Sequence, residues 1–287
     1  MNQVKGTQVS QSQKLMVFVL TMSLYGLATL FSELIPEFQV GIVEFSVEYF
    51  LFIPLTLAML FDPLSVALGA ATGELVFSEI MLGQFGGLGE LEKFLTVTIA
   101  VTITGLIVKN PKNSRMVGFA AIFGVILQQA MSCAVDILKV VFAVEDFEVI
   151  EGLPQSVFAT EGFSFLNDVL FSGILFCLLP TLYLVPRLYG KIEPLLGMKP
   201  REKQDSNRLP SSVAIRMVLL SLIGFGVAVG AEFLSENGMS LIDWEAAWSE
   251  NTTSIIIGIA VAAIIAIVCI ILLTRNRNTK TADTMPR

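Results

Sequence analysis

The feature that most constrains this chain is a series of apolar runs, most of them long enough to cross a lipid bilayer. A helix needs about 20 apolar residues to cross the hydrocarbon core. Eight runs are candidates, and they lie near residues 15–35, 47–61, 64–83, 94–108, 116–143, 165–186, 213–233 and 252–274. The composition is 54% hydrophobic and only 15% charged, whereas soluble domains are about 25% charged. The sequence therefore predicts an all-α, polytopic integral membrane protein.

The connections between the runs alternate in charge. Basic residues lie before the first run and after the fourth, sixth and eighth, and acidic residues fill the connections after the first, third, fifth and seventh. Because basic loops stay in the cytoplasm, this alternation predicts eight spans in the plasma membrane with both termini cytoplasmic. The predicted parts are a polar tail at 1–14, a six-span core at 15–189, a cytoplasmic linker at 190–212, a two-span hairpin at 213–274 and a basic tail at 275–287.

Several functions are excluded by what the sequence lacks. The chain has no histidine, which excludes histidine-ligated metal sites and Ser-His triads. It has no GxxxxGK[ST] stretch, and therefore no phosphate-cradling ATPase loop of its own. A net charge of −7 argues against a nucleic-acid partner. We therefore expect a protein that is not an enzyme, with no catalytic residues, no cofactor and no metal site.

Two acidic residues interrupt the third run, where hydrocarbon makes a carboxylate costly. Glu74 is expected near the membrane midplane and Glu79 nearer the outer surface. Side chains five residues apart on an α-helix point about 140° apart, so the two acids are not expected to face one narrow groove. Glu74 either serves a substrate, an ion or a proton, or makes a structural hydrogen bond to a neighbouring helix. Gly69 and Gly73 form a small-residue pair that is typical of close helix packing.

Further polar residues lie in the outer halves of neighbouring runs. One face of the fifth run carries Gln129, Ser132, Asp136 and Lys139. We expect an outward-facing substrate pocket formed by Glu74, Gln129, Ser132, Asp136 and Asn167, with Glu33, Glu79, Lys139 and Asp168 nearer its mouth. The alternative is a polar network between helices that holds no ligand. Acidic residues outnumber basic ones here, which favours a cationic or neutral substrate.

The first six runs resemble the substrate-binding S component of energy-coupling-factor (ECF) vitamin transporters. The likeness covers roughly residues 15–195. It lies in Pro54 of a short second run, in the stretch LFDPLSVALGAATGE, and in Glu74 as the acid that interrupts a third run rich in Gly and Ala. Members of that family usually end after six spans, so the hairpin at 213–274 is an addition.

The resemblance implies a function and a set of partners. An S component captures a vitamin or another micronutrient in a pocket near the outer face of the membrane. It works with a transmembrane coupling subunit and two ATPase subunits, a division of labour that agrees with the missing phosphate loop. Two other functions stay open on the sequence. One is a stand-alone secondary transporter in which Glu74 or Asp136 carries a proton, and the other is a non-transport membrane subunit whose hairpin holds a partner.

Overall fold

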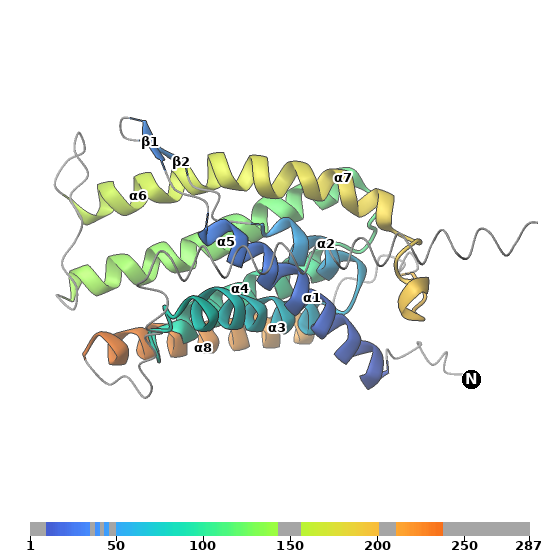
Figure 1. Ribbon diagram of the computed structural model, residues 1–287, viewed down its shortest axis with the longest axis horizontal. Coiled ribbons are helices and arrows are strands. Elements are labelled where there is room, and N and C mark those ends of the chain that lie inside the picture. The colour runs from blue at the N-terminus through green and yellow to red at the C-terminus, as the bar shows by residue number, and fades with distance from the viewer. Residues whose placement is uncertain are drawn as a thin grey trace, which may run out of the picture. The chain divides into compact units, whose positions relative to one another are not determined.

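The computed structural model describes residues 10–34, 38–40, 43–45, 50–142, 156–200 and 211–237, and most of these residues are helical (Figure 1). In chain order the elements are α1 (Gln11–Glu33), β1 (Phe38–Val40), β2 (Val43–Phe45), α2 (Phe52–Leu60), α3 (Pro63–Glu74), η1 (Leu75–Ile80), α4 (Glu90–Ile107), α5 (Ser114–Val141), α6 (Val157–Asn167), η2 (Asp168–Leu178), α7 (Leu179–Leu188), η3 (Pro194–Leu196) and α8 (Ser211–Glu236). The elements η1 and η2 are π-helices, and η3 is a 3-10 helix. All of them belong to one compact unit that ends at Trp244. The predicted eighth span, the C-terminal tail and residues 1–9 lie outside the described residues, whereas residues 11–14 of the predicted N-terminal tail belong to α1.

Among the described residues, four helices are long and apolar enough to cross a membrane, as judged by length and composition. They are Gln11–Glu33, Ser114–Val141, Val157–Leu188 and Ile215–Glu236, and the third joins α6, η2 and α7 into one continuous helix. This confirms the prediction of a mainly helical chain with apolar helices of membrane-spanning length. The helix at the predicted second span is different, because α2 has only nine residues. It rises about 14 Å, roughly half the thickness of the hydrocarbon core.

The expectation of an all-helical chain misses one small sheet. Strands β1 and β2 pair antiparallel, with Phe38 opposite Phe45 and Val40 opposite Val43. The sequence of these segments alternates between apolar and polar residues, which is typical of a strand. Both strands are short, and their flanks are polar. The hydropathy of the whole connection therefore does not distinguish them from a loop.

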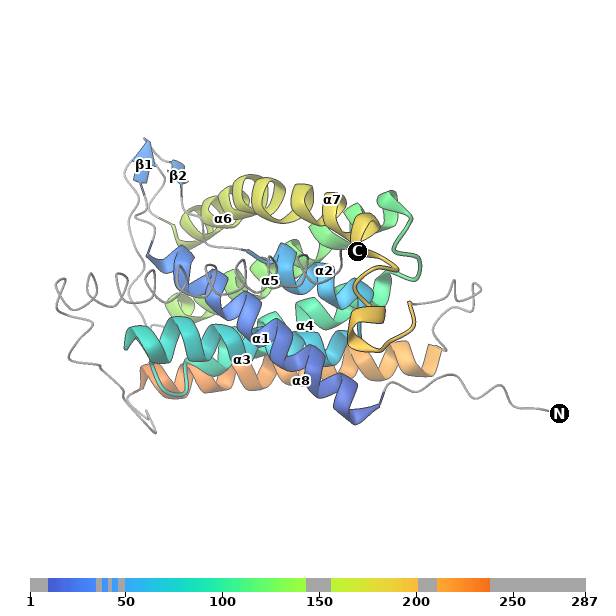
Figure 2. The ribbon, with the colours of Figure 1, turned by 45° about the vertical axis from the view of Figure 1, so that its right-hand side comes forward.

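Glycines in the third predicted span bring α1 and α3 into close contact (Figure 2). A Cβ atom on Gly69 would overlap the backbone oxygen of Phe18, and one on Gly73 would overlap that of Met22. Only glycine permits this approach, as the small-residue pair predicts. Later residues of α3 meet later residues of α1, so the two helices run in the same direction. Asp62 begins α3 by accepting a hydrogen bond from the Ser65 backbone N–H at 3.1 Å.

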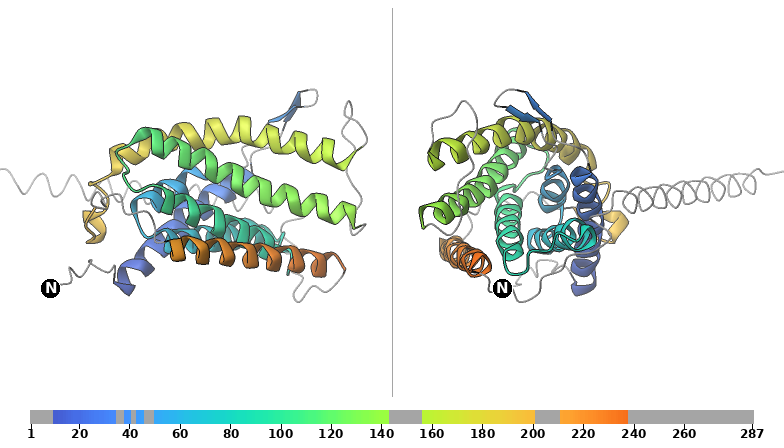
Figure 3. Two further views of the ribbon diagram at one scale, coloured as in Figure 1. Left: turned by 180° about the vertical axis from the view of Figure 1, so that it is seen from behind. Right: turned by 60° about the vertical axis from the view of Figure 1, so that its left-hand side comes forward.

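The remaining helices run alternately up and down the bundle, and α8 lies alongside α4 (Figure 3). At one end of the bundle α1, η1, α5 and α8 finish, and α4 and α6 begin. We call this end the acidic end. The opposite end, which carries Lys109, Lys112, Arg115 and Arg187, is the basic end. The acidic and basic ends thus correspond to the acidic and basic connections of the sequence. Large apolar side chains on the faces of α1, α6, α7 and α8 are exposed, as expected of helices that face lipid.

The segment after α7 folds against the basic end. Ile192, Leu196 and Met198 pack on the hydrophobic core, and Glu193 is only 1% exposed. The side chain of Gln13 at the start of α1 donates a hydrogen bond to the backbone oxygen of Gly197 at 2.7 Å. The first part of the segment predicted as a linker, 190–200, is therefore packed structure rather than a bare connection.

Candidate functional site

The π-helix η1 decides where the two acids of the third predicted span point. In a π-helix the hydrogen bonds join residues five apart, so residues with that spacing lie nearly above one another. The backbone N–H of Met81 donates to the oxygen of Val76, which has this spacing. Glu74 and Glu79 consequently face the same cavity. The expectation that they face different directions is wrong, because it assumed α-helical geometry throughout the span.

A second set of charges comes from the first turn of α4. The apolar run predicted here begins at residue 94, but the helix begins four residues earlier and includes Glu90, Glu92 and Lys93. Acidic residues in a first turn complement the positive end of the helix dipole. The preceding loop turns back through Gly83 and Gly87, whose φ angles of 76° and 72° are rarely adopted by other residues. This reversal brings the start of α4 beside η1.

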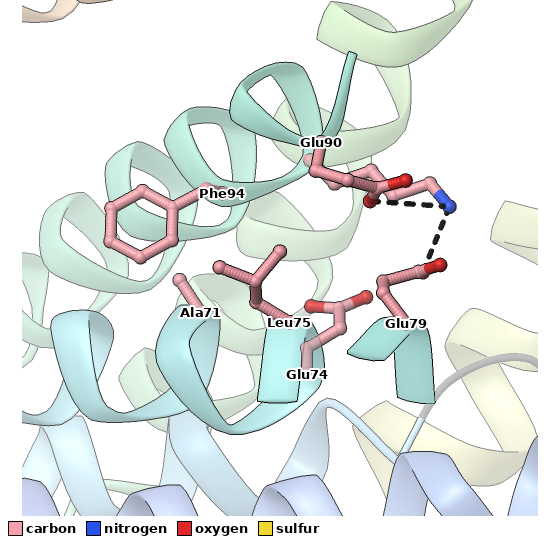
Figure 4. A pocket seen from close by; sticks show the side chains of 7 residues that line it. Ala71, Glu74, Leu75, Glu79, Glu90 and Phe94 are labelled. Carbon is pink, nitrogen blue, oxygen red and sulfur yellow. Dashed lines mark hydrogen bonds and ion pairs between the residues drawn. The ribbon is translucent and has the colours of Figure 1, made fainter. Parts of the chain in front are cut away.

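Lys93 joins the two sets of acids. Its Nζ atom lies 3.0 Å from Oε1 of Glu79 and 4.0 Å from Oε2 of Glu90 (Figure 4). The Glu79 and Glu90 side chains are 8% and 10% exposed, whereas that of Lys93 is 54% exposed. The Gly86 backbone N–H also donates to Oε1 of Glu90 at 3.2 Å. We call Glu74, Glu79, Glu90 and Lys93 the Lys93 cluster.

The Lys93 cluster borders a small cavity with room for about one water molecule. Its lining residues are Ala71, Glu74, Leu75, Glu79, Glu90, Lys93 and Phe94. Figure 4 shows Ala71 and Phe94 at one end, Glu79 and Glu90 at the other, and Glu74 between them. Within the described part of the chain, Oε2 of Glu74 and Oε2 of Glu90 are buried without a hydrogen-bond donor. The cavity is therefore apolar at one end and rich in unsatisfied acceptors at the other.

A second lysine, Lys139, holds another group of charges at the acidic end. Its Nζ atom lies 3.2 Å from Oδ1 of Asp136 and 3.3 Å from Oε1 of Glu232. The side chains of Lys139 and Glu232 are 12% and 14% exposed, so this contact between α5 and α8 is largely buried. Phe142 and Phe233 pack edge to face beside it, with ring centres 5.7 Å apart. We call Asp136, Lys139 and Glu232 the Lys139 cluster.

The other predicted pocket residues lie in separate contacts at the same end. The Gln129 amide donates to Oδ2 of Asp168 at 3.0 Å, which links α5 to η2. The Ser132 hydroxyl donates to Oε1 of Glu92 at 3.0 Å, which links α5 to α4. Asn167 is the last residue of α6 and is half-buried.

Glu33 lies close to Glu74. It is exposed as the last residue of α1, and its carboxyl group is close enough to that of Glu74 to interact electrostatically. Glu33 does not line the cavity.

The predicted pocket residues gather toward the acidic end of the bundle, but most of them do not line this cavity. Of the nine predicted residues, the cavity is lined by Glu74 and Glu79. The sequence interpretation missed Glu90 and Lys93, because hydropathy assigned both to the acidic connection before the fourth run. Lys93 is the base beside Glu79. Glu90 lies four residues before Phe94 and therefore on the same helical face, and this spacing was the available signal.

The acids of the described residues are not arranged as a metal centre. Among the described residues, no group of three Asp, Glu or Cys side chains is placed to hold a metal ion. The Lys93 ammonium instead occupies the space between Glu79 and Glu90. The arrangement suits hydrogen bonding and charge complementarity to a ligand.

The chain matches a known protein family over most of its length. A model described as a family of unknown function (DUF8171) matches residues 16–282. No curated protein and no solved structure matches the chain.

Proposed function

We propose that this chain, which belongs to the family of unknown function DUF8171, is the membrane-embedded substrate-binding subunit of an ECF-type importer. In this proposal it captures a small neutral or cationic micronutrient, such as a vitamin or a vitamin precursor, from outside the cell. The observation that carries the proposal is the cavity at the acidic end, where Glu74 presents a buried carboxyl oxygen with no donor among the described residues. Intramembrane carboxyl groups are costly and usually functional.

The proposed topology places this cavity on the outside. Eight spans in the plasma membrane, with both termini in the cytoplasm, put the acidic end outside and the basic end inside. The alternating helix directions and the charges of the two ends support this orientation. The short α2 and the Gly- and Ala-rich α3 fit the features on which the resemblance to S components rests.

Labelling of single cysteines tests the topology. After Cys133, Cys177 and Cys269 are replaced by alanine, cysteines are placed at Ile150, Ser240 or Asp205. We expect an impermeant maleimide to label the first two from outside intact cells, and the third only after permeabilisation. External labelling at residue 205 would contradict the eight-span arrangement.

The transport class is tested with the full chain purified from its host. We expect native mass spectrometry to find a retained small molecule together with a transmembrane coupling subunit and two ATPase subunits. In liposomes that contain all four components, uptake should require ATP and should continue when proton and sodium gradients are collapsed. Binding by the isolated chain should require no gradient.

A stand-alone secondary transporter is the second candidate, and one observation favours it. Glu74 lies directly before the π-helix η1, and such π-helical turns often occur at functional sites. A carboxyl group without a fixed partner at this position is suited to carry a proton. Uptake by this chain alone, driven by a proton gradient in liposomes, would decide for this candidate and against the importer subunit.

A further inference from the structure

We infer that Glu74 is a proton-binding residue, and that it exchanges its proton with the solution at the acidic end through one water molecule and Glu90. In this arrangement Glu74 is a neutral carboxylic acid at rest, one water molecule fills the cavity, and Glu90 is the carboxylate that receives the proton. The inference goes beyond the proposed function and does not depend on it. A proton site of this kind is compatible with an importer subunit and with a stand-alone transporter.

The size of the cavity and its unsatisfied oxygens point to a bound water molecule. The cavity has room for about one water. Glu74 and Glu90 both line it (Figure 4), and Oε2 of each is buried without a donor among the described residues. A buried water molecule typically makes about three hydrogen bonds to polar groups that otherwise lack partners. One water in this cavity therefore contacts both carboxyl groups and joins them.

The surroundings of the three carboxyl groups decide which of them holds the proton. Glu79 lies 3.0 Å from the Lys93 ammonium, which stabilises its carboxylate form. Glu90 accepts a hydrogen bond from the Gly86 N–H at 3.2 Å and lies 4.0 Å from Lys93, in the first turn of α4. Oε2 of Glu74 has no such donor. Because an isolated buried charge is very costly and the group is neutralised instead, Glu74 is the protonated member.

The charged groups around Glu74 also favour its neutral form. Those that act on it are Lys93 and Glu90 from α4, Glu79 from η1 and Glu33 from α1. Helix α2, which also packs against α3, has no ionisable side chain. Three acids thus face Glu74 with one base, whose closest contact is with Glu79. Nearby like charges disfavour a further negative charge.

Proton transfer through the cavity leaves the water unchanged. The O–H bond of Glu74 breaks as the water oxygen gains that proton, and a different O–H bond of the water breaks as Oε2 of Glu90 gains a proton. Glu74 becomes the carboxylate and Glu90 the carboxylic acid. Glu90 then releases the proton to solvent beside Lys93, whose side chain is 54% exposed. The same steps in reverse return a proton to Glu74.

Infrared spectroscopy tests whether Glu74 holds a proton. Spectra of the full chain in lipid vesicles are recorded at pH 7 for the unaltered protein and for Glu74→Gln. We expect the difference spectrum to contain the C=O band of a carboxylic acid. Glu236→Gln is the matched control, because it changes an exposed acid at the end of α8, and we expect the Glu74 band to remain in that variant. A carboxylate band in place of the carboxylic acid band would overturn the inference.

The rate at which the Glu74 band shifts in D₂O tests the path. Glu90→Gln removes the proton acceptor and keeps the shape of the side chain. We expect the band to remain and its exchange to slow by about tenfold or more, since proton transfer to a positioned side chain is lost. Ala71→Val adds bulk to the wall of the cavity and should slow exchange in the same way. Glu236→Gln should exchange as the unaltered chain does.

Each variant can contradict a different part of the path. Unchanged exchange in Glu90→Gln would show that Glu90 does not receive the proton. Unchanged exchange in Ala71→Val, with the band present, would show that the proton does not pass through water in this cavity. Glu90→Gln does not alter the apolar wall, so it tests the path even if Ala71→Val does not fold.

The inference and the proposed function fail in different ways. If the chain copurifies with ATPase subunits but Glu74→Gln removes no carboxylic acid band, the importer subunit stands and the proton site is wrong. If the band and the path through Glu90 are found but a proton gradient drives uptake by the chain alone, the proton site stands and the importer subunit is wrong.

Discussion

The acidic end contains two lysine-centred clusters that look alike in sequence and differ in structure. In the Lys139 cluster one ammonium group pairs with Asp136 at 3.2 Å and with Glu232 at 3.3 Å, and the lysine side chain is 12% exposed. In the Lys93 cluster the ammonium group lies 3.0 Å from Glu79 and 4.0 Å from Glu90, a third carboxyl group, that of Glu74, lines the same cavity, and the lysine side chain is 54% exposed. A cavity adjoins Lys93, and no lining residue of that cavity belongs to the Lys139 cluster.

The difference separates a structural contact from a site. Charges that are buried together and paired hold two helices in a fixed position, as Lys139 does for α5 and α8. Carboxyl groups that outnumber their cation beside a cavity remain available to a ligand. The intramembrane position of an acid does not by itself distinguish these roles. The burial of the lysine and the presence of empty space beside it do.

The largest expected effect is loss of the cation in the buried cluster. Lys139→Met would leave Asp136 and Glu232 without their shared ammonium group, and breaking a buried pair costs about 3 kcal/mol or more. We expect the melting temperature of the full chain to fall by about 6 °C or more. Lys139→Arg keeps the charge and is the matched control, with a much smaller fall expected. A fall below about 2 °C for Lys139→Met would show that the Lys139 cluster does not hold α8 in place.

Loss of the cation in the Lys93 cluster should cost less. Water can approach the carboxyl groups from the exposed side of Lys93, so we expect Lys93→Met to destabilise the chain by about 1 kcal/mol. Because salt screens exposed charges more than buried ones, the effect should shrink in 0.5 M sodium chloride, a condition under which the Lys139→Met effect persists. Equal and salt-insensitive losses for the two variants would mean that both lysines are structural.

Most helix positions could be predicted from the sequence, but the partners of individual side chains could not. The apolar runs at 116–143 and 165–186 correspond closely to α5 and to the joined helix Val157–Leu188. Hydropathy could not include the charged first turn of α4, so Lys93 was assigned to a loop. The i, i+5 geometry of η1 is invisible to a search for α-helical periodicity, which is why Glu74 and Glu79 were separated.

Contacts between distant segments were also beyond the sequence interpretation. Lys139 and Glu232 are 93 positions apart in the chain, and no local pattern links them. The sequence gives the chemistry of each residue on a helix, but the rotation and depth of neighbouring helices determine which residues meet. For this reason the acidic end was predicted correctly, whereas its division into two clusters required the packed structure.

A glycine between the two clusters offers a smaller effect. A Cβ atom on Gly89 would lie 2.9 Å from Oε2 of Glu232 and 3.3 Å from Oγ of Ser235. Both are ends of side chains that can move slightly, so we expect Gly89→Ala to lower stability by about 0.5 to 1 kcal/mol. Gly226→Ala on α8 is the control, because a Cβ atom there meets nothing within 4 Å. We expect that control to be neutral or slightly stabilising in a melting experiment, and a loss equal to that of Gly89→Ala would contradict the close contact between α8 and the loop before α4.

The smallest expected effect on stability belongs to the residue at the centre of the proposed site. Glu74→Gln preserves the size of the side chain, removes one of three carboxyl groups beside a single ammonium group, and adds an amide that can donate to a neighbouring carboxyl oxygen. These changes do not break an ion pair of Glu74 with Lys93, whose close contact is with Glu79 at 3.0 Å. We therefore expect the free energy of unfolding to change by less than about 0.5 kcal/mol, while binding of the retained substrate weakens at least tenfold, or about 1.4 kcal/mol. Melting curves and binding titrations on the same preparation measure both quantities. If Glu74→Gln melts as early as Lys139→Met and still binds its substrate normally, Glu74 is a structural contact between helices, and the two clusters serve the same purpose.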